Sequence, residues 1–240
     1  METFVPERAP MVILGFLGMC LALGLAGLVL LYALAAQKLA LAKRTVAMAF
    51  ALGGAYAGLL LAASLTSTEK TLGAGQWKYF CEVDCHLAYS VTGVSTAKTL
   101  GEGQNPATAE GTFYVVTIRT WFDEDTISRT RGDGILHPNL RTARIMDSRG
   151  RRYPPSLPGQ LALQLPANKL IALDQPLRPG ESYETTLVFD VPADAESPRL
   201  YLTDPLPVNW VLIGHENSFF HRRVYFGLEP RPAVGRASQL

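Results

Sequence analysis

A long uncharged segment near the start of the chain constrains its fold more than any other feature. Residues 11–36 are 26 consecutive residues without a charged side chain. About 20 apolar residues cross the hydrocarbon core of a bilayer as an α-helix, so this segment is long enough to do so with some tilt. Residues 46–67 form a second uncharged segment of 22 residues. We therefore predict two transmembrane helices, over residues 11–36 and 46–67.

The loop between these segments predicts their orientation. It contains Lys38, Lys43 and Arg44, whereas the ten residues before the first segment contain one basic residue and two glutamates. Short loops rich in Lys and Arg stay in the cytoplasm. We expect a hairpin in the cytoplasmic (inner) membrane, with both termini on the extracytoplasmic side. The alternative, a cleaved signal peptide followed by one anchor, requires a basic start and a shorter apolar core of about 7–15 residues.

Small residues recur in both segments, and Gly54 and Gly58 form a GxxxG motif in the second. Such motifs allow close approach of helix backbones in lipid. Two interpretations stay open: the two helices pack on each other, or the motif forms a homodimer or docks on another membrane subunit. Neither segment contains an ionisable Asp, Glu, Lys, Arg or His, which argues against a transporter or pump.

After the second segment the sequence changes character. Residues 68–76 are small and polar and predict a linker. Residues 77–91 alternate apolar and polar side chains, which is typical of one long half-buried strand. Residues 113–122 are β-branched and aromatic, without Gly or Pro, and indicate a central strand.

Turn signals divide the rest of the chain into short strands. Asp147 and Gly150 stand at the first and fourth positions of a type I turn, which predicts a hairpin. Pro179 and Gly180 indicate a type II turn before a strand at residues 182–190. Further strands are predicted at residues 199–202, 210–213 and 224–228. The expected architecture is an antiparallel β-sandwich over residues 77–228, followed by a flexible tail at residues 229–240.

Three segments carry a resemblance to a known family. FYVVTIR begins at Phe113, IMDSRGRRYP begins at Ile145, and PLRPGESYETTLVFDVP begins at Pro176. Together they resemble the strands and turns of bacterial extracytoplasmic immunoglobulin-like domains of unknown function, over most of residues 77–228. The resemblance implies an immunoglobulin-like sandwich. It implies no enzymatic activity and no functional residue.

Cys81, Cys85 and His86 form the most suggestive chemical cluster. Thiolates and imidazole suit copper, so a copper-binding or thiol-redox protein is an alternative function, and copper the alternative cofactor. If the segment were one regular strand, the two cysteines would lie about 13 Å apart, too far for a disulfide. Two buried structural cysteines, a disulfide across a β-bulge and a metal site therefore remain open, with no metal site as the main expectation.

Two further groups are candidates for contact with a partner or with membrane lipid. Residues 129–152 contain seven arginines and two aspartates, and arginine suits bidentate contact with carboxylates and phosphates. The second group lies between the last two predicted strands, where loops of a sandwich often carry binding residues. The candidate residues are Arg141, Arg144, Arg149, Arg151 and Arg152 in the first group, and His215, Glu216 and His221 in the second.

No nucleophile elbow, phosphate-binding loop or dinucleotide fingerprint occurs in the sequence. We therefore expect a non-enzymatic protein of the bacterial envelope that binds or scaffolds an envelope protein or a membrane complex. An accessory subunit of a membrane complex is a further alternative. Nucleic acid is not an expected partner on this side of the membrane.

Overall fold

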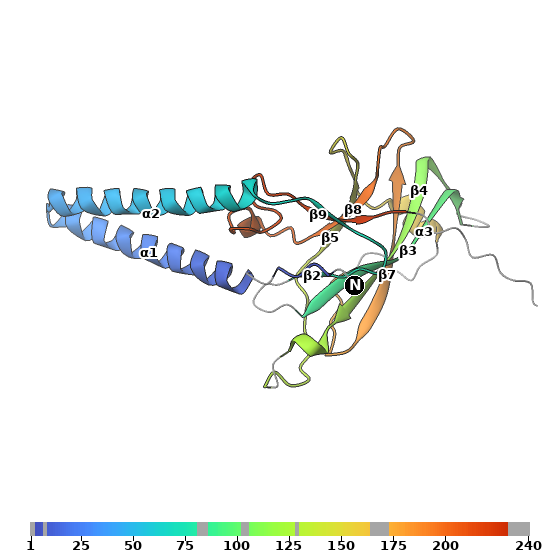
Figure 1. Cartoon of the computed structure of the whole chain (residues 1–240), viewed down its shortest axis with the longest axis horizontal. Helices are drawn as coiled ribbons and strands as arrows, with labels where there is room; N and C mark the ends of the chain where they lie inside the picture. Colours follow the sequence, from blue (N-terminus) through green and yellow to red (C-terminus); the bar gives the residue numbers. More distant parts are fainter. Residues whose placement is uncertain are drawn as a thin grey trace, which may run out of the picture.

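A computed structural model describes residues 3–6, 9–80, 86–101, 106–127, 130–163 and 173–229. Two long helices form a hairpin at one end of the molecule, and a pair of β-sheets forms the other end (Figure 1). The predicted tail at residues 229–240 lies outside the described residues except for Glu229.

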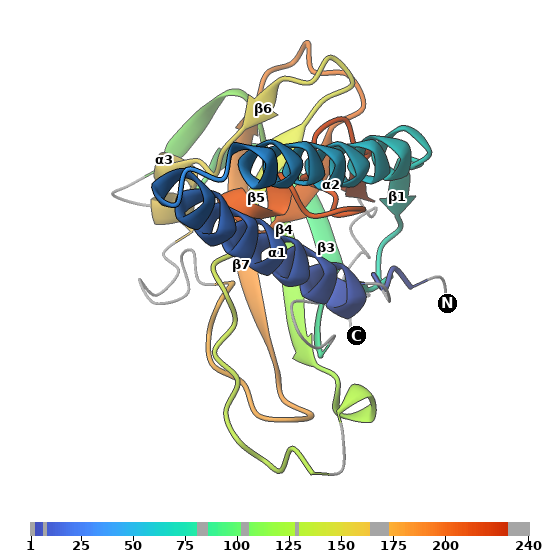
Figure 2. The same cartoon turned by 90° about the vertical axis from the view of Figure 1, so that its left-hand side faces the viewer.

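The helices are α1 (Ala9–Ala35) and α2 (Leu39–Leu65). Both are long and apolar enough to cross a membrane, and almost none of their surface is buried within the chain. Helix α2 begins seven residues before the predicted segment and includes Lys43 and Arg44, because Ala, Leu, Lys and Arg are good helix formers whatever their polarity. The helices meet at the tip of the hairpin and diverge toward the sheets (Figure 1, Figure 2).

Two sheets make up the second part of the molecule. In the described residues, the four-stranded sheet has the order β2 (Lys78–Phe80), β3 (Leu87–Leu100), β4 (Ala107–Phe122) and β7 (Ser182–Val191), all antiparallel. The other sheet has the order β1 (Lys70–Leu72), β9 (Val224–Gly227), β8 (Arg199–Thr203), β5 (Thr142–Met146) and β6 (Arg152–Tyr153). Short helices η1 (Glu124–Thr126), α3 (Leu157–Ala162) and η3 (Pro207–Trp210) connect strands.

The core lies between the two sheets. Alternate residues of β4 and β7 point toward it because successive side chains of a strand face opposite sides. The fully buried members include Val116, Ile118 and Phe189 from one sheet and Ile145, Leu200, Leu202 and Phe226 from the other. The arrangement is therefore a two-layer β-sandwich that is mostly antiparallel, with one parallel pair between β1 and β9.

Several predicted elements are confirmed. Strand β4 is central, since it pairs with β3 on one side and β7 on the other. Strands β5 and β6 form the predicted hairpin, and the amide of Gly150 donates to the carbonyl of Asp147 at 3.0 Å. Gly180 has a φ of 80°, as a type II turn requires, and the amide of Glu181 closes that turn by donating to the carbonyl of Arg178.

Three predictions about the strands are wrong. Residues 77–91 are not one strand, because β2 ends at Phe80 and β3 runs antiparallel to it from Leu87; the polar and apolar alternation continues across the reversal and conceals it. Residues 68–76 are not only a linker, since they contain β1. Residues 210–213 do not form a strand: Trp210 ends η3, bends and a turn follow it, and Trp210 and Val211 are exposed whereas Leu212 is buried.

The start of the chain belongs to the sandwich. The amide of Phe4 donates to the carbonyl of Trp77, and the amide of Tyr79 donates to the carbonyl of Phe4, both at 2.9 Å. Phe4 thus pairs with Lys78 as a short parallel bridge, and its ring packs against the main core. Both ends of the helical hairpin are therefore attached to the same body.

Candidate functional site

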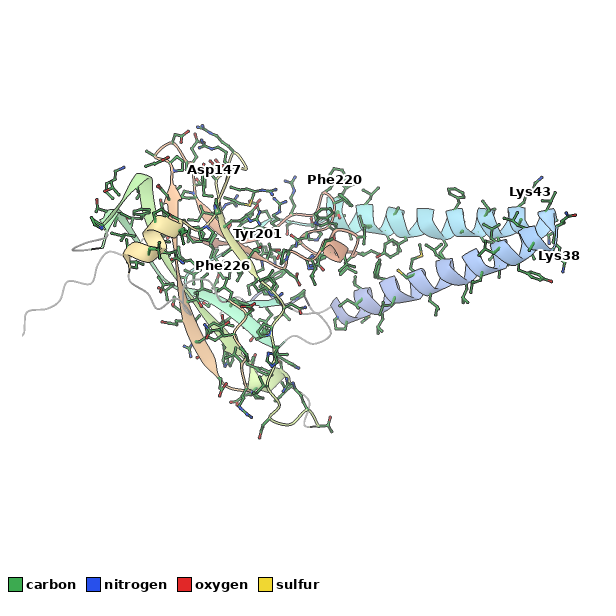
Figure 3. All side chains as sticks on the ribbon, turned by 180° about the vertical axis from the view of Figure 1, so that it is seen from behind. Lys38, Lys43, Asp147, Tyr201, Phe220 and Phe226 are labelled. Atoms are coloured by element: carbon green, nitrogen blue, oxygen red, sulfur yellow. The ribbon has the colours of Figure 1, made fainter. Side chains whose placement is uncertain are left out.

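The structure divides the candidate residues into two places. Arg141 is brought next to the segment that contains His215, Glu216 and His221. The turn that contains Arg149, Arg151 and Arg152 is marked by Asp147 in Figure 3, on the part of the sandwich away from the hairpin. The first place, the β8–β9 loop (residues 204–223), adjoins the helices and is the better-defined site.

A buried ion pair fixes the β8–β9 loop to the other sheet. The Nζ atom of Lys78 on β2 lies 2.8 Å from the carboxylate of Glu216, and the side chains are 1% and 8% exposed. Lys78 also donates to the carbonyls of Leu202 and Val224. Burial lowers the pKa of Lys78, while the Glu216 carboxylate acts in the opposite direction. Because the ammonium reaches three acceptors, its hydrogen-bonding capacity is filled.

A second buried ion pair holds the start of the loop. The guanidinium of Arg141 lies 3.2 Å from the carboxylate of Asp204, and both side chains are buried. The guanidinium also lies over the ring of Phe80, 4.6 Å from its centre. Asp204 accepts from the amide of Leu206 through its other oxygen. Arg141 therefore positions the loop from within and is not exposed for contact with a partner.

Asn217 completes the internal support of the loop. Its amide nitrogen donates to the hydroxyl of Thr203 at 2.8 Å and to the carbonyl of Asp204. Its oxygen accepts from the hydroxyl of Tyr201 at 2.5 Å. The hydroxyl of Ser218 donates to the carbonyl of Leu212. These bonds give the loop one defined conformation despite its lack of regular structure.

The outer edge of the same loop is apolar. Trp210 and Phe219 are each 53% exposed, and Phe220 is 73% exposed. The rings of Trp210 and Phe219 lie edge to face with centres 6.3 Å apart. We define the apolar edge as Leu206, Val208, Trp210, Val211, Phe219 and Phe220, all of which are exposed large apolar residues.

The apolar edge lies against the hairpin. The hydroxyl of Tyr56 on α2 donates to the carbonyl of Val211 at 2.8 Å. At the end of α2, the amide of Arg222 donates to the hydroxyl of Ser67, also at 2.8 Å. Figure 3 places Phe220 where α2 meets the sandwich. The loop therefore contacts α2 at two levels along its axis.

The two histidines of this loop have different surroundings. Burial lowers the pKa of His215 to about 4, against the opposing effect of Glu216, and Lys78, His221 and Arg141 lower it further. The Nδ1 atom of His215 accepts from the amide of Asn217. His221 is less enclosed, and its Nδ1 atom lies 2.7 Å from the carbonyl oxygen of Arg222. His215 is thus a neutral structural residue at neutral pH.

The arginine turn is organised around Asp147. The Asp147 carboxylate accepts from the amides of Arg149 and Arg151, from the guanidinium of Arg151 and from the hydroxyl of Tyr153. Burial alone would raise the pKa of Asp147, but the hydrogen bonds from Arg151 and Tyr153 outweigh it and the pKa is lowered. Asp147 therefore determines the shape of the turn.

Acidic neighbours partly neutralise this turn. Arg151 lies 2.7 Å from the carboxylate of Asp194, and Arg149 pairs with Glu196. Within the described residues, Arg152 is exposed without an ion pair, and the half-buried Arg144 on β5 has none either. The turn presents mixed charge and no isolated basic patch.

The alternative copper site falls mostly outside the described residues, because Cys81 and Cys85 are among those the structure does not describe. His86 is described and buried. Its Nδ1 atom lies 2.8 Å from the hydroxyl of Thr126, and its ring stacks on Phe122. Across the described ranges no group of three metal-binding side chains occurs. The estimate of 13 Å between the cysteines no longer applies, since the single strand on which it rested is absent.

Gly54 and Gly58 are exposed on α2 and do not face α1. A Cβ atom built at either position would meet nothing within 4 Å. The GxxxG motif is therefore not what packs the two helices together, which leaves this face of α2 open.

The apolar edge was missed by the sequence analysis, although a signal was present. Residues 205–214 contain ten residues without charge, including Trp210 and two prolines. The apolar residues 210–213 predict a strand, but prolines at 205 and 207 disfavour a strand inside a sheet. The absence of charge, together with the aromatic residue and the prolines, distinguishes this apolar loop from a buried strand in a chain that also has two predicted membrane segments.

Comparison with known proteins gives distant structural likenesses only. No protein family and no curated protein matches the sequence. A secreted protein of Mycobacterium tuberculosis, MPT63, has 11% identity and a TM-score of 0.40, over 68% of this chain and 99% of that one. The yjhA protein of Bacillus subtilis has 13% identity and a TM-score of 0.38, over 66% and 100%. A conserved hypothetical protein of Bacillus anthracis has 13% identity and a TM-score of 0.36, over 49% and 81%. These low scores assign no function.

Proposed function

We propose that this chain is a membrane-anchored protein of the bacterial envelope. Its helical hairpin crosses the cytoplasmic membrane twice and holds an immunoglobulin-like β-sandwich on the extracytoplasmic side, where the sandwich binds or scaffolds another envelope component. The pairing of Phe4 with Lys78 carries this proposal. Because the residues before α1 and after α2 join one sandwich, both ends of the hairpin lie on the same side, as two crossings require.

The surface of the hairpin supports membrane insertion. Both helices expose large apolar side chains along their length, such as Leu14, Leu28 and Phe50. Contiguous apolar surface of this extent marks contact with lipid or protein. Lys38 and Lys43 lie at the tip of the hairpin, far from the sandwich (Figure 3), so the positive-inside rule directs the tip to the cytoplasm.

Natural lysines allow a direct test in intact cells. Spheroplasts that express the full chain are treated with a membrane-impermeant amine reagent, and modified lysines are identified by mass spectrometry. We expect modification of the exposed Lys70 and Lys98 in intact spheroplasts. Lys38 and Lys43 become modified only after permeabilisation, while buried Lys78 stays unmodified in both conditions. Equal modification of Lys38 and Lys98 in intact spheroplasts contradicts the proposal.

The arginine turn is the proposed contact for the unidentified envelope partner. Figure 3 labels Asp147 of this turn at one side of the sandwich, apart from the end where Phe220 lies beside α2. Arg149 and Arg152 are exposed, whereas Arg151 supports the turn through Asp147. A double Arg149→Ala/Arg152→Ala variant therefore removes the contact and keeps the turn.

Crosslinking in membranes tests this surface. We expect the double variant to lose at least two thirds of the partner crosslinks of the natural chain. Arg119→Ala is the matched control, because Arg119 is exposed on β4 of the other sheet. An unchanged crosslinking pattern in the double variant excludes the turn as the contact.

A further inference from the structure

The apolar edge of the β8–β9 loop is directed toward the open end of the hairpin. The loop lies between the diverging ends of α1 and α2 in both views (Figure 1, Figure 2). Its contacts with α2 run from Ser67, just beyond the helix, to Tyr56. Tyr56 precedes Leu65, the last residue of α2, by nine residues, which corresponds to about 13 Å at 1.5 Å per residue.

The polar groups of the loop are arranged as a lipid environment requires. A backbone carbonyl in hydrocarbon needs an internal partner, and the carbonyl of Val211 accepts from the hydroxyl of Tyr56. The charged side chains Asp204 and Glu216 turn inward to Arg141 and Lys78. Between residues 204 and 220, the exposed residues of the loop are apolar.

The loop also holds its aromatic side chains outward at a cost. Phe220 has a φ of 64°, a left-handed conformation that non-glycine residues rarely adopt. Its ring remains 73% exposed. Trp210, beside it in the loop, is of the residue type enriched at membrane interfaces.

Basic residues lie just above the apolar edge. Arg222 is exposed, and its backbone amide donates a hydrogen bond to the hydroxyl of Ser67, just beyond the end of α2. Lys70, three residues after Ser67 in the chain, is also exposed. At this level they can meet lipid phosphates. Along the axis of α2, Val211 of the apolar edge lies beside Tyr56 and Arg222 lies beside Ser67 beyond the helix end, which is the order of an apolar region followed by a headgroup region in one leaflet.

We propose that the apolar edge inserts into the outer leaflet of the membrane beside α2, as a third, interfacial anchor. This inference rests on the proposed membrane insertion of the hairpin. It assigns lipid acyl chains, with phosphate headgroups at Arg222 and Lys70, as the ligand of the β8–β9 loop. The sandwich is consequently held in one orientation on the membrane instead of swinging on its two connections.

Photoactivatable lipid tests the proposal with the full chain. The protein is reconstituted in vesicles that contain a phosphatidylcholine with a diazirine in its acyl chain, irradiated and digested with trypsin. Trypsin releases the apolar edge in one peptide, residues 200–222. The peptides of residues 9–38 and 45–70 cover the hairpin, and the peptide of residues 99–119 covers part of the sandwich. We expect lipid adducts on the peptide of residues 200–222 and on both hairpin peptides, at least fivefold above residues 99–119.

The pattern of adducts separates the two proposals. Adducts on the hairpin peptides with none above background on residues 200–222 overturn the interfacial anchor and leave the proposed function intact. An absence of adducts on the hairpin peptides contradicts the proposed function itself. If the apolar edge instead contacts a second copy or another protein, the same peptide carries no lipid adducts, which also overturns the anchor.

A variant pair shows whether the exposed rings make the contact. Phe219→Ser/Phe220→Ser removes two rings that have few internal contacts, so the fold is retained. We expect lipid adducts on residues 200–222 to fall at least threefold. Leu161→Ser on α3 is the matched control, since Leu161 is 56% exposed, close to the 53% of Phe219, and the substitution should leave the adducts unchanged. No decrease in the phenylalanine variant overturns the proposal.

Discussion

Lys78 and Glu216, 138 residues apart in the chain, form an ion pair of 2.8 Å that is buried between β2 and the β8–β9 loop. Lys78 belongs to the four-stranded sheet, and Glu216 precedes β9 of the other sheet. The pair therefore connects the two layers of the sandwich at the end that carries the helices. Breaking a buried pair by removing one member is strongly destabilising, because it leaves an uncompensated charge.

Lys78→Met should lower the free energy of unfolding by about 3–5 kcal/mol, since the Glu216 carboxylate would remain buried without its partner. Glu216→Gln should cost less, because the amide still accepts a hydrogen bond from Lys78. Chemical unfolding of the full chain in detergent, followed by tryptophan fluorescence, measures both.

The double variant Lys78→Met/Glu216→Leu is the control for this prediction. It removes both charges, so we expect it to be more stable than Lys78→Met alone. If the double variant loses the sum of the effects of Lys78→Met and Glu216→Leu measured singly, the pair has no coupling energy and its role as a connection is wrong.

Acid should destabilise the sandwich through His215. Its pKa is about 6.5 when unfolded and about 4 when folded, so the unfolded chain binds the proton more readily. The stabilising contribution is fully present above pH 6.5 and is lost as the pH falls through 4. His215→Gln should flatten the pH dependence of the melting temperature in this window. An equally steep profile in His215→Gln would assign the dependence to other groups.

Asp147 should matter more for stability than the arginines around it. Asp147→Asn weakens four hydrogen bonds that shape the turn, whereas the exposed ion pair of Arg149 with Glu196 is of the kind that contributes about 0–1 kcal/mol. Thermal unfolding should therefore show a larger decrease for Asp147→Asn than for Arg149→Ala. The reverse order would mean that the ion pairs, not the carboxylate bonds, hold the turn.

Gly111 should not tolerate a side chain. A Cβ atom there would lie 2.0 Å from the carbonyl oxygen of Val191, the last residue of β7. Gly111→Ala must therefore displace the end of β7 and should lower the free energy of unfolding by about 1–3 kcal/mol. At Gly93 on β3 the nearest atoms, on Thr117, are 3.7 Å away. Gly93→Ala is therefore the matched control and should have a much smaller effect in the same unfolding measurement.

The open face of α2 predicts where a homodimer would form. Since Gly54 and Gly58 do not pack against α1, Gly54→Leu/Gly58→Leu should leave the hairpin intact and weaken self-association at least tenfold. Energy transfer between labelled chains in vesicles measures association. Equal association of the variant and the natural chain would remove this motif from the interface.

Sequence periodicity predicted the elements whose environment is uniform. Both helices and the central strand β4 were predictable because residues 11–36, 46–67 and 113–122 are mostly apolar or β-branched, whereas the charged start of α2 and the polar start of β4 lay outside the predicted segments. The turn at Asp147 and the turn at Gly180 were predictable because their backbone conformations require particular residues.

The candidate site was less predictable because its contacts join distant segments. Arg141 belongs to an arginine-rich sequence that suggests exposure, yet Asp204, 63 residues later, makes it a buried residue. The alternation through residues 77–91 contains no sign of the reversal between β2 and β3. Residues 210–213 are all apolar, yet Trp210 and Val211 are exposed and Leu212 is buried, and hydrophobicity alone does not distinguish these two environments.

The bridge between Phe4 and Lys78 has a consequence for how the chain is made. In a hairpin that crosses the membrane twice, the first residues must be translocated ahead of α1, and their sheet partner emerges only after α2 has been inserted. The N-terminal segment is therefore translocated before β2 is made, and Phe4 can pair with Lys78 only after the rest of the chain has followed. A chain inserted with its N-terminus on the wrong side would lack the Phe4 bridge and leave one edge of β2 exposed, while its other edge still pairs with β3.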